Sequence, residues 1–173
     1  MEACENYQKQ SYRNRCRICA ADGVQDLRFP VRHGGGSISL PIREIEVDYS
    51  TPWVEKAERC IETAYLSSPF FAYYRDELFA ILDARPDTLW ELDMRIIRFF
   101  MAKIGIRTEI LPTEQYAPEH VDIHPKRSNT ILRDLGLDRP YYQVFAQRNG
   151  FIPGLSVMDL LFCEGPASLD FIL

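Results

Sequence analysis

Alternating apolar and polar residues in the first third of the chain predict a small sheet. Residues 27–31 alternate apolar side chains with Arg28 and Pro30, and residues 45–49 alternate apolar side chains with acidic ones. Pro30 favours an edge or bulge position, because proline cannot donate to a sheet ladder. The glycine triplet at 34–36 lies between the two segments, so we expect them to pair as an antiparallel hairpin.

From Trp53 the apolar period changes from two to 3.6, which predicts three helices. The first runs from Trp53 to about Ala64. The second takes Ser68 as its N-cap and Pro69 as its first residue. The third begins at Thr88 with a capping box and ends where glycine permits a left-handed turn. The residues expected in its apolar stripe and at its end are Leu89, Leu92, Ile96, Phe99, Phe100 and Gly105.

The last third of the chain is less regular. Residues 106–110 alternate as a short strand, residues 111–139 are typical of a loop with one weak helical turn near 130–135, and residues 141–145 are aromatic and β-prone. Ser156 caps a final helix that Gly165 and Pro166 stop. We therefore expect one α+β domain over residues 1–173, with a small mixed or antiparallel sheet covered on one face by the three central helices.

Composition supports this picture and removes some classes of function. The 173 residues suit one domain, and 46% hydrophobic with 26% charged residues is a globular composition. The formal net charge of −5 opposes general nucleic-acid binding, and no apolar run is long enough for a membrane helix or placed as a secretory signal. We expect a soluble, cytoplasmic protein that uses no cofactor.

Residues 7–15 carry the strongest polar signal. If this segment is extended, the cationic and hydroxyl side chains project from one face and could hold a phosphate or carboxylate, while Tyr12 and Asn14 face the other way. The alternative is a solvated strand, because most charge clusters are surface. The four side chains on the proposed anion-binding face are Lys9, Ser11, Arg13 and Arg15.

The cysteines allow two further hypotheses. Cys16 and Cys19 have the spacing of a metal or redox pair, and His120 with His124 could complete a zinc site if they share a helix face. The alternative is two partly buried thiols and two loop histidines. Cys16 lies between two arginines that would lower its pKa, which makes it the cysteine most suited to react.

Two long motifs, spanning residues 5–15 and 151–166, together resemble the signatures of the WbqC-like proteins. Trp53 with the following helix, residues 67–71 and residues 140–145 fall in the expected order, so the resemblance covers nearly the whole chain. The family is associated with bacterial O-antigen and surface-polysaccharide gene clusters, and its reaction is not firmly assigned. Members usually carry a further strand and helix before the first motif, which this chain is expected to lack.

The resemblance implies an enzyme of surface-polysaccharide assembly that acts on a nucleotide-linked sugar by acyl or aminoacyl transfer. Asp159 and Glu164 are then the acid/base candidates. The alternative is a non-catalytic module that binds a glycan or a protein, for which the aromatic pairs supply stacking surfaces. The expected substrate- or phosphate-binding residues are Tyr7, Lys9, Ser11, Arg13, Asn14, Arg15, Tyr142 and Gln143.

Overall fold

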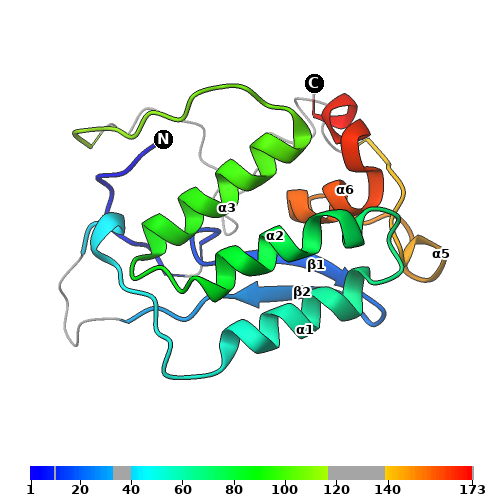
Figure 1. The fold of residues 1–173 in the computed structure, drawn as a ribbon, viewed down its shortest axis with the longest axis horizontal. Coiled ribbons are helices and arrows are strands. Elements are labelled where there is room, and N and C mark those ends of the chain that lie inside the picture. The colour runs from blue at the N-terminus through cyan, green and yellow to red at the C-terminus, as the bar shows by residue number, and fades with distance from the viewer. Residues whose placement is uncertain (10, 33–39, 117–138, 173) are drawn as a thin grey trace.

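A two-stranded antiparallel sheet and three long helices form the body of the molecule (Figure 1). The structure is a computed structural model, and it describes residues 1–9, 11–32, 40–116 and 139–172. Strands β1 (Arg15–Ala20) and β2 (Gly23–Arg28) pair from Arg15 opposite Arg28 to Ala20 opposite Gly23. Helices α1 (Trp53–Tyr65), α2 (Phe71–Asp83) and α3 (Leu89–Ile104) follow, which confirms the α+β class.

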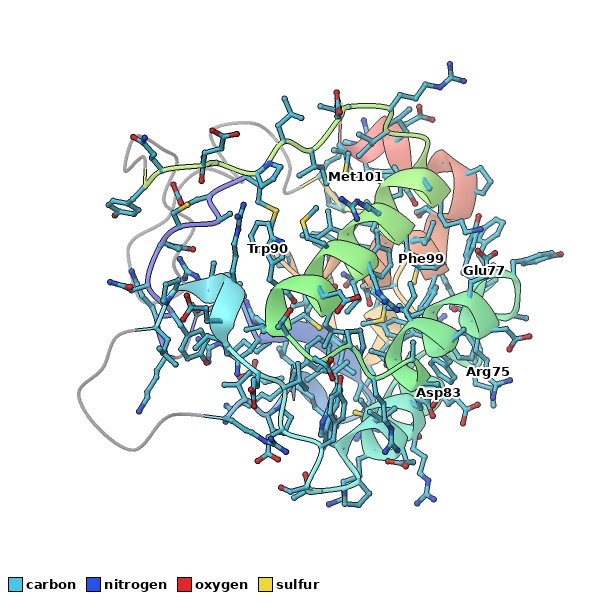
Figure 2. The ribbon with its side chains drawn as sticks, turned by 60° about the vertical axis from the view of Figure 1, so that its left-hand side comes forward. Arg75, Glu77, Asp83, Trp90, Phe99 and Met101 are labelled. Carbon is cyan, nitrogen blue, oxygen red and sulfur yellow. The ribbon has the colours of Figure 1, made fainter. Side chains whose placement is uncertain are left out.

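The C-terminal part consists of short elements that pack against this body. Helix α5 (Ala146–Asn149) precedes α6 (Val157–Glu164), and the 3₁₀ helix η2 (Gly165–Phe171) continues directly from α6. Near the start of the chain, the 3₁₀ helix η1 (Ile42–Glu44) packs against α3. Figure 2 shows Trp90 on the first turn of α3 beside η1, where the Arg43 guanidinium lies 5.5 Å from the indole centroid.

The main core joins the sheet to four helices. Ile18 and Leu27 are buried on the sheet and belong to the same cluster as Ile61, Phe79 and Phe100 from α1, α2 and α3. Phe162 of α6 is fully buried at its centre. Its ring packs edge-on against Tyr65 and Phe71, each with centroids 5.2 Å apart. Such aromatic contacts add about 0.5–1.5 kcal/mol each beyond the burial of area, so α6 is an integral part of the core.

The hairpin of the structure differs from the one predicted. The regular strands are residues 15–20 and 23–28, whereas the predicted segments 27–31 and 45–49 meet only at an isolated bridge between Val31 and Val47. Two backbone bonds flank that bridge, from Arg32 N to Glu46 O and from Asp48 N to Pro30 O, both 2.9 Å long. The predicted pairing is therefore present but short. The glycine triplet and the weak helical turn near 130–135 lie outside the described residues.

Three predicted helix boundaries are confirmed and one is wrong. Thr88 accepts a 3.2 Å bond from Glu91 N, and Gly105 ends α3 in the left-handed region at φ 92°. Ser156 caps α6 as predicted. Ser68 does not cap α2: its hydroxyl donates to Tyr65 O instead, and α2 begins only at Phe71.

The two strands predicted late in the chain do not form. Residues 106–110 have no ladder partner among the described residues, and residues 141–145 form a turn that leads into α5. Tertiary contacts decide both outcomes, because the aromatic side chains of the second segment are used to dock α6 rather than to extend the sheet.

Gly165 lets α6 turn into η2 beneath Phe70. Its φ is 55°, and a Cβ at this position would lie 2.5 Å from the Phe70 ring. Gly105 also ends a helix at positive φ but has open space around the same point. The two glycines therefore differ both in the space around an added Cβ and in ψ, which is −128° at Gly165 and 15° at Gly105.

We expect Gly165→Ala to destabilise the protein more than Gly105→Ala. Gly105→Ala adds the left-handed penalty of about 1–2 kcal/mol. Gly165→Ala adds a residue with a Cβ at φ 55° and ψ −128°, outside the left-handed region, and about 1–3 kcal/mol of overpacking against Phe70. Urea unfolding of the two variants measures the difference. Equal losses of stability would show that the Phe70 contact relaxes freely.

Candidate functional site

The first motif folds as a turn and not as an extended strand. Tyr7 N donates to Leu40 O and Ile42 N donates to Glu5 O, so the segment is held against the stretch before η1. The buried Ser11 hydroxyl donates to Gln8 O at 2.7 Å. The prediction that four anion-binding side chains share one strand face is therefore wrong, because local hydrogen bonds bend the chain at this point.

Arg13 is bound by a carboxylate of its own motif. Its Nε donates to Glu5 Oε1 at 2.7 Å and its Nη2 pairs with Glu5 Oε2, which gives the two-pronged geometry typical of strong guanidinium–carboxylate pairs. Both side chains are about one-fifth exposed. The charge of Arg13 is thus already balanced locally.

Asp93 of α3 interacts electrostatically with Arg13 and Tyr7. Arg13 lowers and Asp93 raises the pKa of Tyr7, whose pKa is raised chiefly by burial. Burial likewise raises the pKa of Asp93 well above its usual range, against a smaller opposing effect of Arg13. Glu5, Tyr7, Arg13 and Asp93 form what we call the first-motif cluster. A carboxyl group with a strongly raised pKa beside a fixed cation is typical of functional sites.

The sequence analysis missed Asp93, although one signal was available. Asp93 stands between Leu89 and Ile96 at helical spacing, within the apolar stripe of α3. Among the described residues it has no hydrogen-bond or ion-pair partner. Asp93 is only partly buried, so protein atoms surround it without removing it completely from solvent. An acidic residue in a core-facing stripe needs such an explanation.

The other predicted anion-binding residues are not gathered around this cluster. Lys9 is exposed, and Asn14 Nδ2 donates to Phe29 O at 3.0 Å to hold the entry to β1. Arg15 Nη1 lies 3.6 Å from Asp26 Oδ2 on β2. The structure therefore keeps Tyr7 and Arg13 together and gives Ser11 and Asn14 roles in the turn.

The predicted C-terminal residues form a second, separate group. The carboxylate of Asp159, which is 1% exposed, accepts bonds from Tyr65 at 2.9 Å, from Tyr141 at 2.7 Å and from Gln143 Nε2 at 3.2 Å. We call these four residues the Asp159 network. Burial raises the pKa of Asp159, while the three donated bonds act in the opposite direction. Burial and the carboxylate together raise the pKa of Tyr65 and of Tyr141.

The neighbouring residues of this group also have structural partners. Gln143 is 2% exposed and exchanges two bonds of 2.9 Å with the backbone of Ile152. Glu164 Oε1 accepts from Tyr142 N at 2.7 Å, which gives this residue the local role that the sequence did not reveal. Asp159 and Gln143 are thus closed off from solvent, whereas the Tyr142 side chain is 52% exposed.

Ser156 connects the two groups through β1. Its backbone N donates to Arg17 O at 2.8 Å, so the segment before α6 covers part of the open edge of β1. The Ser156 side chain lowers and Asp93 raises the pKa of Cys16, whose pKa is raised chiefly by burial. At the turn end of β1, Asn149 Nδ2 donates to Ala20 O at 3.2 Å.

The structure changes the two cysteine hypotheses. Cys16 and Cys19 are three residues apart on a strand, so their side chains point to opposite faces of the sheet. Burial raises the pKa of Cys16 to about 12, which overturns the expectation of an activated thiol. In the described part of the chain no three metal-ligating side chains come together. His120 and His124 lie outside the described residues.

A shallow groove runs between β2 and α1, away from both groups. Asp26, Arg28, Trp53 and Lys56 are among its lining residues. None of the substrate-binding or acid/base residues predicted from the sequence lines it. No helix within the described ranges has the length and apolar character needed to cross a membrane.

Comparison with known proteins agrees with the family resemblance, and the family match includes the first motif. The model of the WbqC-like protein family matches residues 1–139, which is most of the chain. The chain belongs to the WbqC-like protein family. It is also similar to Rv1507c, an uncharacterised protein of Mycobacterium tuberculosis, with 26% identity over 194 aligned residues that cover 96% of this chain and 83% of the relative. No solved structure matches.

We expect Tyr65→Phe to destabilise this WbqC-like protein by about 1.5–3 kcal/mol near pH 8, because it removes a hydrogen bond to a buried carboxylate. The loss should be smaller near pH 4, where a protonated Asp159 gains less from each donor. Unfolding midpoints at both pH values test this. Tyr73→Phe on α2, where the side chain is 75% exposed, is the control and should change little.

Asp93→Asn should raise stability at neutral pH. The folded pKa of Asp93 lies above its unfolded value, so ionisation of this group costs folding free energy as the pH rises through the folded pKa. The variant therefore gains most near pH 8, and the gain should vanish below about pH 4, where both states are protonated. Thermal unfolding across this range, with the exposed Asp83→Asn as control, measures it. A constant difference at all pH values would contradict the assignment.

Proposed function

We propose that this WbqC-like protein is a cytoplasmic enzyme of bacterial surface-polysaccharide (O-antigen) biosynthesis, and that it acts on a nucleotide-linked sugar at the first-motif cluster. The family resemblance motivates the pathway. The observation that supports the site is Asp93, a carboxyl group with raised pKa and no described partner, beside the Arg13–Glu5 pair. Arginine, carboxylates and a tyrosine hydroxyl together offer donors and acceptors that suit sugar hydroxyl groups.

Acyl or aminoacyl transfer to the sugar is the reaction class that we propose. A sugar hydroxyl or amine attacks the carbonyl carbon of an activated acyl donor, and the leaving group departs with the electrons of the broken bond. The attacking group must lose a proton, and Asp93 is the acceptor in our proposal, because a raised pKa makes a carboxylate a better base. This replaces Asp159 and Glu164 in that role, since Asp159 is closed off and Glu164 is bound to Tyr142 N.

The phosphates of the nucleotide would contact cationic side chains of the first motif. Lys9 in this motif is exposed to solvent. Arg13 would share its guanidinium between Glu5 and the ligand. Charge-assisted bonds of this kind are stronger than those between neutral groups.

A non-catalytic glycan-binding module is the second candidate function. Two exposed aromatic side chains favour it: Tyr12 in the first motif is 40% exposed, and Tyr142 is 52% exposed. Each offers a ring face on which a sugar could stack. Both functions require sugar binding, so a measurement of turnover, and not of affinity, distinguishes them.

Calorimetric titration of the full chain with UDP-, GDP-, dTDP- and CDP-linked sugars tests the site. We expect one nucleotide-sugar to bind, and the paired variant Glu5→Gln with Arg13→Gln to weaken it by about tenfold or more, because it removes a charge-assisted contact without leaving a lone charge. The matched control is Glu55→Gln with Arg85→Gln, which removes an ion pair on the exposed surface.

Two outcomes would overturn the assignment to the first-motif cluster. One is the absence of binding by every nucleotide-sugar in the set. The other is equal affinity in the Glu5/Arg13 variant and the control.

A further inference from the structure

The groove between β2 and α1 has a defined direction. Cys60 Sγ on α1 lies 3.4 Å from Gln25 Oε1 near the start of β2. The rings of Trp53, the first residue of α1, and Phe29, which follows β2, have centroids 5.1 Å apart. The helix therefore runs antiparallel to β2 along the groove, as Figure 1 also shows, and its first turn lies beside the end of the strand.

Two basic side chains line this end of the groove from opposite walls. Arg28 ends β2, where 69% of its side chain is exposed, and Lys56 stands in the first turn of α1 and is also exposed. The dipole of α1 adds positive potential at this turn. The acidic residue of the same turn, Glu55, is bound to Arg85 at 3.0 Å. This end of the groove is therefore positively charged, in a chain whose formal net charge is −5.

The strand register places a second guanidinium group beside Arg28. Arg15 is its cross-strand partner, so the two side chains lie on one face of the hairpin. Like charges directly opposite each other destabilise a sheet. Here one carboxylate oxygen, Asp26 Oδ2, lies 3.0 Å from Arg28 Nη2 and 3.6 Å from Arg15 Nη1. Two guanidinium groups thus share one negative charge, which leaves Arg28 able to bind a further anion.

Apolar side chains line the groove next to these cations. Leu27, Trp53 and Ala57 are each less than one-tenth exposed. Beside such a surface the effective dielectric constant is lower than in water, so charge-assisted bonds are stronger there. The groove has a volume of about 790 Å³, which is within the range of small-molecule sites. It therefore has room for a ligand larger than a single phosphate.

We propose that the Arg28 end of this groove binds a diphosphate group, at a site that the proposed function does not use. Arg28 offers a planar guanidinium fork to one phosphoryl group, and Lys56 on the opposite wall offers an ammonium group to the other. A single phosphate has one phosphoryl group to place between two walls, so the second contact favours the diphosphate. Asp26 stays paired with Arg15 when Arg28 turns to the ligand.

Calorimetric titration of the full chain with inorganic pyrophosphate, at fixed ionic strength and without divalent cations, tests this site. We expect pyrophosphate to bind about tenfold tighter than inorganic phosphate. The variant Arg28→Gln with Lys56→Gln should weaken pyrophosphate binding by about tenfold or more, because it removes both charge-assisted contacts. Arg28→Lys with Lys56→Arg conserves both charges and should keep most of the affinity. Both side chains are exposed, so the variants should fold, which their unfolding midpoints check.

The matched control is Arg98→Gln with Arg107→Gln. Both residues are exposed, neither lines the groove, and their replacement removes the same two positive charges from the chain. Equal pyrophosphate affinity in this control and in the Arg28/Lys56 variant would overturn the inference, because net charge alone would then attract the anion. Absence of pyrophosphate binding, or equal binding of phosphate and pyrophosphate, would also overturn it.

UDP-glucose, or the nucleotide-sugar selected in the preceding titrations, separates two sources of the diphosphate. If the Arg28/Lys56 variant weakens this ligand and pyrophosphate alike, the groove holds the diphosphate of the nucleotide-sugar. If the variant weakens pyrophosphate alone, the groove serves a separate diphosphate ligand, and the inference also stands. If pyrophosphate binds and no nucleotide-sugar does, the proposed function fails while this inference is supported.

Discussion

The structure depends most on the buried carboxylate of Asp159. It lies on the first turn of α6 and accepts hydrogen bonds from α1 through Tyr65 and from the preceding segment through Tyr141 and Gln143. These three donors offset the cost of removing a charge from water. The negative charge also suits the N-terminal end of a helix, where backbone N–H groups point toward it. One side chain thus fixes three parts of the chain that are far apart in sequence.

Docking of α6 in turn completes the sheet. With only two strands, the outer edge of β1 would expose a row of unpaired backbone groups. The segment that leads into α6 covers part of this edge, because Ser156 N donates to Arg17 O. The C-terminal motif therefore has a structural reason to be long: it must satisfy the β1 edge, cap α6 and surround Asp159 in succession.

Local signals made part of this fold predictable. The Thr88 cap, the Gly105 end of α3 and the Ser156 cap each depend on residues within one helical turn, and all three are confirmed. The predicted hairpin lies further along the chain than the observed one, because the arginines of β1 suggested a surface patch instead of a paired strand. The local turn signal is Asp22-Gly23: Asp22 lies in the two-residue connection between the strands, and Gly23, at φ 115°, begins β2.

The site was harder to predict because its members meet only in the folded chain. Arg13 and Glu5 are close in sequence, but nothing in their spacing shows that they bind each other rather than a ligand. The sequence predicts Asp159 and Glu164 of the last helix as acid/base candidates. In the structure Asp159 is the more buried of the two, with 1% of its surface exposed. Asp93 could have been noticed as an acid in an apolar stripe, but its neighbour Arg13 is eighty positions away in sequence.

Asp93 and Asp159 show how one physical quantity can indicate opposite roles. Burial raises the pKa of both carboxyl groups. Asp159 is surrounded by donors that the protein itself supplies, so its charge is used to hold the fold. Asp93 has a nearby cation that already belongs to Glu5, and part of the residue stays open to solvent. A raised pKa alone therefore does not distinguish a structural carboxylate from a functional one. The number of hydrogen-bond donors that the fold provides to each carboxylate does distinguish them. By that criterion Asp159 is a structural carboxylate, and Asp93 is the carboxyl group that our proposed function uses.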